Sequence, residues 1–274
     1  MKFAPVLPPE LYYKFDGGDY HMVQAHLLAK NRKLQDWTQQ ALSRGHTVIL
    51  DNGVIELGTP ATRALYDVAK KVRPTLVVCP DAYMDPDKTL AYQTQHLLTL
   101  QHLCDNVMLV PQGRTLGKWM DCALEMLKQS LPTLVYVGVP KYLDVYHELG
   151  RLLVVNALVN DFKIGPSYIH LLGIHSIQAV AAIVEKFPDV LGVDSTLPVA
   201  AALYRTGQGM DTVDKVTLDR EDWYLTAWDL SHAQIASLQE NIGWTRQLVA
   251  NAPSGDRSKC LGMGRPMSTP GPSL

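Results

Sequence analysis

Short apolar runs alternate with amphipathic stretches along most of the chain. Between the runs, apolar positions recur at helical spacing over residues 59–72, 85–104, 116–131, 144–159 and 176–187, with Gly150 as a point where the fourth helix is expected to split. Strands that alternate with helices in this rhythm pair in parallel through crossover helices. The apolar runs that predict strands are residues 47–50, 75–79, 106–110, 133–137, 168–172 and 190–193.

The first 44 residues are less regular and add two weak strand candidates. Residues 1–7 are a weak strand candidate, residues 20–28 fit a strand or a helix, and residues 31–44 predict a helix. Six strands alone would fit an open doubly wound sheet, whereas eight close a barrel. Polar residues follow most of the strands, and a barrel gathers all strand ends around one mouth. We therefore predict an α/β protein with a (β/α)8 TIM-type barrel over residues 1–205.

The pattern changes after the barrel. Residues 206–250 predict a helical C-terminal extension packed on the barrel, with its main helix over residues 223–250. Residues 251–274 are rich in proline, glycine and serine, so a disordered tail is expected there.

Composition narrows the function classes. The formal net charge is −2, so a nucleic-acid partner would need a local basic patch. The four cysteines form no Cys-x-x-Cys pair, which argues against a zinc ribbon or disulfide framework and suits a reducing compartment. No apolar run is long enough to cross a bilayer. A cytoplasmic protein without a membrane partner is expected.

Polar residues at the strand ends are the candidate functional residues. Each also has an ordinary structural role: Asp194 or Ser195 could cap the next helix, Asp51 could form an Asx turn, and Asp81 could cap or turn the chain before residue 85. In chain order, the strand ends carry Asp51-Asn52-Gly53, Pro80-Asp81, Pro111-Gln112-Gly113, Gly138-Val139-Pro140, Leu172-Gly173-Ile174 and Asp194-Ser195-Thr196-Leu197-Pro198.

This order of motifs resembles the tRNA-guanine transglycosylase superfamily, (β/α)8 barrels that exchange guanine for a 7-deazaguanine base. Asp51-Asn52-Gly53 is similar to the family's Asp-Ser-Gly-Gly motif, and Asp194-Ser195-Thr196-Leu197-Pro198 resembles its Asp-x-x-Leu-Pro nucleophile motif. The resemblance covers residues 48–205. It implies a pentosyltransferase in which Asp194 is the nucleophile and Asp51 the acid/base residue, and it implies that the base is bound by Asp81, Gln112, Gly138 and Val139.

The chain departs from the family's tRNA enzymes at the zinc site. No Cys-x-Cys-x-x-Cys follows Asp194, so we expect no structural zinc. The resemblance implies no metal ion and no cofactor for the reaction. This reduced form resembles the phage and bacterial relatives that place 7-deazaguanines, related to queuine and preQ0, into DNA. The resemblance thus favours DNA over tRNA as the polymer, a free 7-deazaguanine base as co-substrate, and the host cytoplasm as the location if a phage encodes the protein. It also allows a homodimer.

Three cationic residues follow strand ends and are candidates for binding the phosphates of the nucleic-acid backbone, namely Arg114, Lys141 and Arg205. Three other functions stay open at this point. The polymer could be tRNA, or the barrel could bind a purine or nucleic acid without turning it over. A metal-dependent hydrolase is the third, because His21, His170 and His175 could join the aspartates as ligands.

Overall fold

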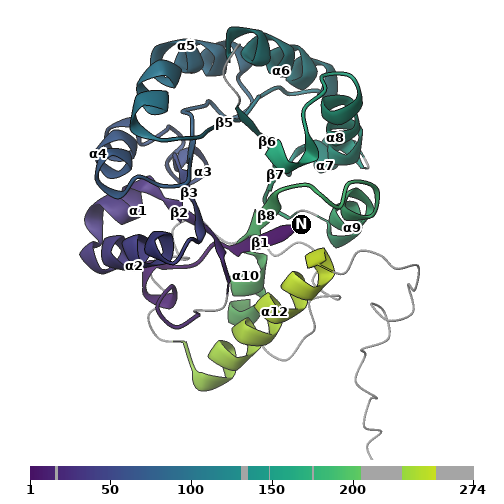
Figure 1. Ribbon diagram of the computed structural model, residues 1–274. Coiled ribbons are helices and arrows are strands. Elements are labelled where there is room, and N and C mark those ends of the chain that lie inside the picture. Colours follow the sequence, from purple (N-terminus) through teal and green to yellow (C-terminus); the bar gives the residue numbers. More distant parts are fainter. Residues whose placement is uncertain (16–17, 131–134, 148, 175, 205–229, 251–274) are drawn as a thin grey trace, which may run out of the picture.

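Eight parallel strands line the centre of the protein, and helices surround them (Figure 1). This computed structural model describes residues 1–15, 18–130, 135–147, 149–174, 176–204 and 230–250. The hydrogen-bonded order is β1-β8-β7-β6-β5-β4-β3-β2, and β1 lies beside β2, so the sheet is a nearly closed (β/α)8 barrel. The strands are β1 (Lys2–Pro5), β2 (Tyr20–Gln24), β3 (Thr47–Asp51), β4 (Leu76–Val78), β5 (Val107–Leu109), β6 (Tyr136–Pro140), β7 (Ile169–Leu172) and β8 (Gly192–Ser195).

Several of the surrounding helices begin after a side chain that accepts a hydrogen bond from one of their free N–H groups. Asn31 accepts a hydrogen bond from Leu34 N at the start of α2, and Asp85 accepts one from Lys88 N before Pro86 opens α5. The helices of the barrel are α1 (Ala25–Lys30), α2 (Arg32–Ser43), α3 (Val54–Leu57), α4 (Thr62–Val72), α5 (Pro86–Leu103), α6 (Leu116–Ser130), α7 (Leu143–Tyr146), α8 (Gly150–Asn160), α9 (Ile177–Lys186) and α10 (Leu197–Tyr204), with 3-10 turns at Pro9–Leu11 and Pro166–Tyr168.

The core fills both the barrel interior and the layer between strands and helices. All residues of β2, β4, β5 and β8 are buried, as expected for strands that are covered on both faces. On α4, the buried positions Leu65, Val68, Ala69 and Val72 form one apolar stripe that faces the sheet. A continuous apolar core therefore holds the strand ends in fixed positions.

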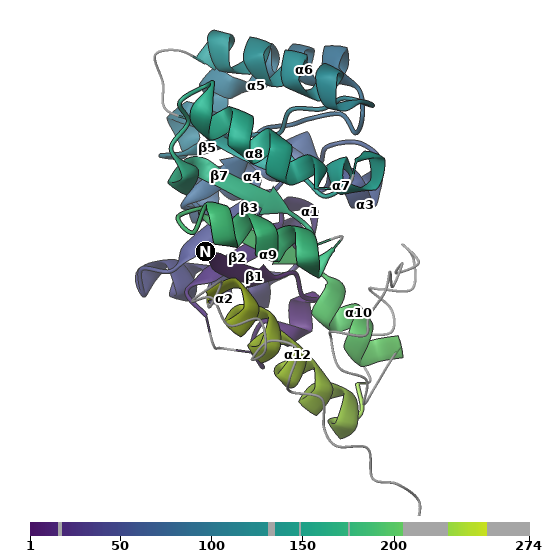
Figure 2. The same cartoon turned by 90° about the vertical axis from the view of Figure 1, so that its right-hand side faces the viewer.

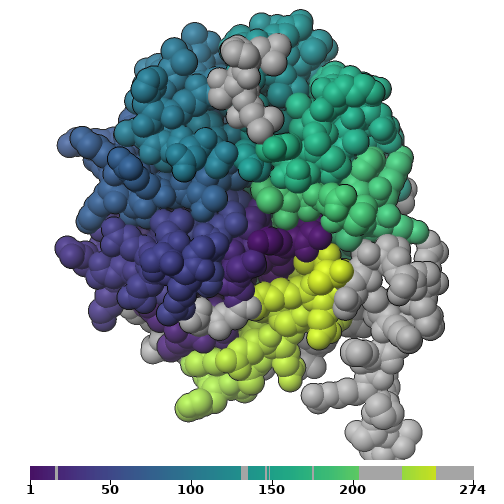
Figure 3. All heavy atoms as spheres, viewed as in Figure 1, coloured from purple at the N-terminus to yellow at the C-terminus, as the bar shows by residue number. Residues whose placement is uncertain are grey.

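A long C-terminal helix, α12 (His232–Ala250), completes the described structure. It packs against α10 and β1, where Figures 1 and 2 show it lying outside the barrel. In the space-filling view α12 lies along the N-terminal segment (Figure 3). The Asn241 side chain donates to the Pro198 carbonyl at 3.3 Å and ties α12 to the start of α10. The rest of the predicted extension and the tail over 251–274 lie outside the described residues.

The structure confirms the barrel and moves several boundaries. Residues 20–28 divide into β2 and the start of α1, and the helix predicted over 144–159 splits before Gly150 as α7 and α8. β6 begins at residue 136 rather than 133, and β8 ends at residue 195 rather than 193. The sequence indicated where apolar runs lie, but strand limits depend on which residues pair with the neighbouring strands. Helix α3 was not predicted.

Two predictions from composition concern cysteines and membranes. Cys79, Cys104 and Cys122 are free thiols in the core. Within the described ranges, no helix combines the length and the apolar character that crossing a bilayer requires.

Candidate active site

Three aspartates meet at the C-terminal mouth of the barrel. Asp51 is the last residue of β3, Asp81 follows β4 by three residues, and Asp194 lies in β8, one residue before its end. Their charges interact, because those of Asp81 and Asp194 both contribute to raising the pKa of Asp51. The structure therefore brings together the three carboxylates that the sequence placed at separate strand ends.

Asp194 is held by one of its two oxygens. It is 8 % exposed, and its Oδ1 accepts hydrogen bonds from His170 Nε2 at 3.0 Å and from Gly173 N at 3.2 Å. Within the described part of the chain, no group donates a hydrogen bond to Oδ2, and the protein does not fully enclose this oxygen. One carboxylate oxygen is thus fixed, and the other is accessible for reaction.

A buried tyrosine sets the orientation of His170. The Tyr20 hydroxyl lies 2.7 Å from His170 Nδ1, and loss of solvation, followed by the charge of Asp194, raises the pKa of Tyr20 well above 10. The phenol therefore keeps its proton and donates a hydrogen bond to Nδ1, so that Nε2 carries the ring proton and donates a hydrogen bond to Asp194. Gly192 makes this approach feasible, because a Cβ there would lie 2.5 Å from a Tyr20 ring carbon.

The surroundings of Asp51 favour the protonated form of its carboxyl group. Loss of solvation raises its pKa well above 3.8, and the charges of Glu56, Asp81 and Asp194 add to this increase. Its Oδ2 accepts from Gly53 N at 3.2 Å, so the Asx turn considered from the sequence is present. Gly53 has φ of +73° and completes this turn in a conformation that glycine adopts readily. The structural and acid/base roles of Asp51 are therefore compatible.

Asp81 lies in a cradle of two side-chain amides. It is 2 % exposed, its Oδ1 accepts from Asn52 Nδ2 at 2.6 Å, and its Oδ2 accepts from Gln112 Nε2 at 2.6 Å. Burial raises the pKa of Asp81 from 3.8 to about 6, even though both amide hydrogen bonds act to lower it. Asp81 is consequently a carboxylate held at both oxygens, with its pKa raised by burial.

Backbone groups fix which end of each amide faces Asp81. Val54 N donates to Asn52 Oδ1 at 2.9 Å, and Met84 N donates to Gln112 Oε1 at 3.0 Å. Because a backbone N–H can only donate, both amide NH₂ groups must point toward Asp81. The cradle is built for an acceptor at this position.

The helix caps considered for Asp194 and Asp81 are formed by neighbouring residues. Ser195, not Asp194, caps α10, because its Oγ accepts from Leu197 N at 3.0 Å. Asp85, not Asp81, caps α5. Asp194 and Asp81 therefore have no helix-capping bond among the contacts of the described residues.

The remaining predicted residues differ in position. Gly138 and Val139 lie inside β6, in register with His170 and Leu171 of β7, rather than in a loop after the strand. Arg114 lines a cavity of about 270 Å³ with Lys118, Met84, Asp85 and Pro86. Lys141 is exposed just after β6. Arg205 lies outside the described residues.

The histidines considered as metal ligands are not gathered at the mouth. His21 lies near the start of β2 and contacts His46 at 3.1 Å, whereas His170 is at Asp194. His175 is not among the described residues, and in the part of the chain that is described no three His, Cys, Asp or Glu side chains form a group suited to a metal ion.

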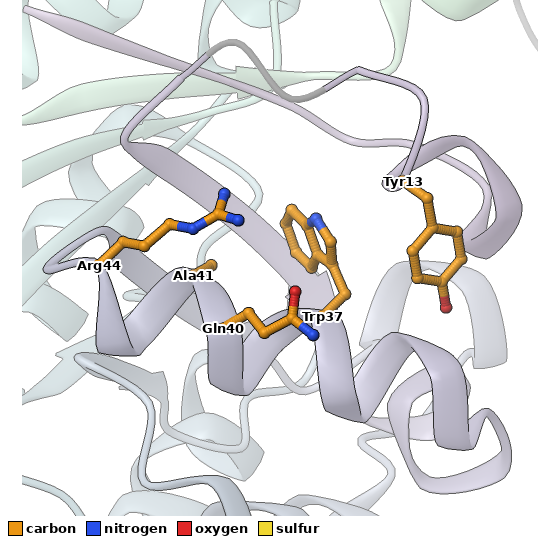
Figure 4. Close-up of a pocket in the computed structure, with 5 residues that line it drawn as sticks. All are labelled: Tyr13, Trp37, Gln40, Ala41 and Arg44. Carbon is orange, nitrogen blue, oxygen red and sulfur yellow. The ribbon is translucent and has the colours of Figure 1, made fainter.

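A second cavity lies away from the aspartates. It measures about 200 Å³ and is lined by residues of α2, by Arg44 just after it and by Tyr13 from the segment before β2, as Figure 4 shows; the α2 residues are Trp37, Gln40 and Ala41. Gln40, Ala41 and Arg44 lie at the C-terminal end of α2, which leads into the start of β3, while Asp51 is at the other end of that strand. This cavity does not belong to the site at the mouth.

Sequence reasoning missed the partners of the aspartates. His170 was considered only as a metal ligand, and Tyr20 had no role. One signal existed for His170: a polar residue within an apolar strand needs a buried partner.

No family model matches the chain, and no curated protein does. Among solved structures, the chain is similar to a crystal structure of oxaloacetate acetylhydrolase, with 12 % identity, a TM-score of 0.39, and coverage of 86 % of this chain and 98 % of that one.

Proposed function

We propose that the protein is a base-exchange transglycosylase that replaces guanine in nucleic acid with a 7-deazaguanine. The observation that carries this proposal is the pair of carboxylates Asp194 and Asp51. One has an accessible oxygen, and the other has a pKa raised in part by the first. A covalent glycosyl exchange needs these two states, a nucleophile and an acid/base group.

The exchange proceeds in two displacements. Asp194 Oδ2 attacks C1′ of the target nucleoside, the C1′–N9 bond breaks, and the departing guanine takes a proton from Asp51. The incoming base then gives its N9 proton to the Asp51 carboxylate, its N9 attacks C1′, and the ester bond to Asp194 breaks. Two inversions at C1′ retain the configuration of the nucleoside.

The Asp81 cradle supports guanine as the type of base. Guanine offers N1–H and its 2-amino group as adjacent donors, which match the remaining lone pairs of the Asp81 carboxylate. The second N–H of Gln112 Nε2 can donate to O6, because only one is needed for Asp81. A buried polar site of this kind discriminates strongly against bases that leave its groups unpaired.

Arg114 supports a polymeric substrate. It shares its cavity with Lys118 and Met84, and Met84 N is bonded directly to Gln112 of the cradle. A nucleotide whose base is held by Gln112 would therefore have its phosphate within reach of two cations. The target base must leave its stack to enter the barrel. DNA is the polymer that we favour, on the sequence resemblance.

Incorporation of radiolabelled guanine tests this function. Wild-type protein, Asp194→Ala, Asp51→Asn and the control Asp67→Asn are incubated with duplex DNA, single-stranded DNA or bulk tRNA. Asp67 is an exposed aspartate on α4, so its variant should match wild type. We expect label to enter DNA with wild type and the control alone. Entry into tRNA alone would reassign the polymer, and base binding without incorporation would indicate a binding protein.

A further inference from the structure

A buried guanidinium lies behind the turn that holds Asp194. Arg151, in the first turn of α8, is 0 % exposed. Its Nε donates to Asp144 Oδ2 at 2.5 Å and its backbone N donates to Asp144 Oδ1 at 2.9 Å. Its Nη1 donates to the Gly173 carbonyl at 2.6 Å. The ion pair thus connects α7, α8 and the end of β7.

Gly173 transmits this anchoring to Asp194. Its N–H donates to Asp194 Oδ1, whereas its carbonyl, which belongs to the next peptide plane, accepts from Arg151. The angle between the two planes depends on φ and ψ of Gly173, and its φ of +73° is a conformation that glycine adopts at little cost. Fixing the carbonyl therefore fixes the direction of the N–H.

Stability alone does not account for this arrangement. Apolar residues of similar volume often stabilise a fold as well as a buried ion pair does. Arg151 Nη2 is buried without a hydrogen-bond partner among the described residues. The junction of α7 and α8 is also tight: Leu149 has φ of +61°, and a Cβ at Gly150 would lie 2.2 Å from the Leu143 carbonyl oxygen. Such strain persists where surrounding structure imposes it, often near functional sites.

We propose that Arg151 is a positioning residue for Asp194. Paired with Asp144, it locks the Gly173 turn so that the Gly173 N–H and His170 hold Oδ1 and leave Oδ2 available for attack. This inference rests on the proposed function for the role of Oδ2, but the locking of the turn can be measured without any reaction.

Steady-state kinetics of base exchange test the effect on reaction. Arg151→Met should lower kcat about 100-fold, the loss expected for a reacting group displaced by about 1 Å, with KM changed less than about 3-fold. Arg151→Lys keeps the charge but cannot reproduce the planar fork, so it should recover only part of the loss. The control Arg63→Met breaks an exposed Arg–Asp pair on α4 and should match wild type. Full recovery by Lys, or a change confined to KM, would contradict positioning.

NMR of the free protein tests the turn itself. In Arg151→Met, the amide signal of Gly173 and the ring ¹⁵N signals of His170 should both shift, whereas Arg63→Met should leave them unchanged. If these signals move but wild type exchanges no base, the proposed function fails and the locking of the turn stands. If wild type is active and Arg151→Met alters neither kcat nor the signals, the inference is wrong.

A milder variant covers the case in which Arg151→Met does not fold. Asp144→Asn keeps an oxygen that can accept from Arg151 N but removes the negative charge. It should shift the same NMR signals and lower kcat about 10-fold, equivalent to one weakened charged hydrogen bond. Wild-type signals and kcat in this variant would overturn the proposal.

Discussion

Asp81 and Asp194 occupy the mouth of the same barrel, but their hydrogen bonds differ. Both oxygens of Asp81 accept hydrogen bonds from side-chain amides. In the described part of the chain, by contrast, the two groups that donate to Asp194 both bond to Oδ1. A carboxylate fixed at both oxygens presents a rigid pattern of acceptors, which suits recognition of a flat base. A carboxylate fixed at one oxygen keeps the other for bond formation. Two aspartates at the same place in the fold can therefore suit different roles, because the donors around each oxygen differ.

Asp194→Asn should have the largest effect of any single change. The amide oxygen can still accept from His170 and Gly173, so the fold is retained, but an amide cannot attack C1′. We expect base exchange to fall by about 10⁴-fold or more, as for loss of other enzymatic nucleophiles. Mass spectrometry of quenched protein should show a glycosyl adduct with wild type and none with this variant. Asp189→Asn, at an exposed position before β8, is the matched control. An adduct on the variant would exclude Asp194 as the nucleophile.

Asp81→Asn should affect base binding instead. One amide NH₂ of the new side chain would face the fixed NH₂ of Asn52 or Gln112, and the charge that attracts the donor edge of guanine would be lost. Affinity for free guanine should fall about 100-fold, the equivalent of one or two charged hydrogen bonds. Calorimetry measures this, with Asp194→Asn as the comparison, which should bind guanine within about 3-fold of wild type. Equal losses in the two variants would remove the distinction between the aspartates.

Asp81 should also make stability and base binding depend on pH in opposite directions. Its pKa is raised from 3.8 to about 6 in the folded protein, so the folded state binds more protons than the unfolded state in this interval. The free energy of unfolding should therefore decrease by about 3 kcal/mol from this group as pH rises from about 4 to above 6. Guanine binding should increase over the same range, because the ionised carboxylate is the better acceptor.

Urea unfolding between pH 4 and pH 7 measures the stability part. The raised pKa of Asp51 acts in the same direction, so the contribution of Asp81 is the difference between wild type and Asp81→Asn. A wild-type slope retained in Asp81→Asn would assign the pH dependence to Asp51 or another group.

The barrel was predictable because its signals are local. The strand and helix rhythm depends on residues a few positions apart, and the motifs after β3, β4 and β8 lie at strand ends, which parallel topology gathers at one rim. The limits of β6 and β8 were not predictable to the residue. As a result, Gly138 and Val139 were expected beyond a strand that in fact includes them.

The hydrogen-bond partners of the aspartates could not be deduced from the sequence. Tyr20 and His170 are 150 positions apart, and their contact exists only because the sheet curls until β2 and β7 face one interior. Arg151 gave no signal either, since a cation on a helix is normally assigned to solvent. The gathering of the three aspartates at one rim was thus predictable, and the hydrogen bonds around each of them were not.

The smallest expected effects come from two tyrosines, each of which contacts a hydrogen-bond partner of one of the two carboxylates. Tyr20 contacts His170 behind Asp194, and the Tyr142 hydroxyl donates to Gln112 Oε1 at 3.0 Å behind Asp81. Gln112 is also held by Met84 N, so Tyr142→Phe should leave its amide in place and change KM about 3-fold or less. Tyr20→Phe removes the donor to Nδ1 and permits the tautomer whose Nε2 lone pair would face Asp194. That variant should lower kcat about 10-fold. Steady-state kinetics of the two variants, each with its unfolding temperature, compare the two sides of the site directly. A larger loss of kcat in Tyr142→Phe would mean that the base cradle, rather than the orientation of Asp194, limits the reaction.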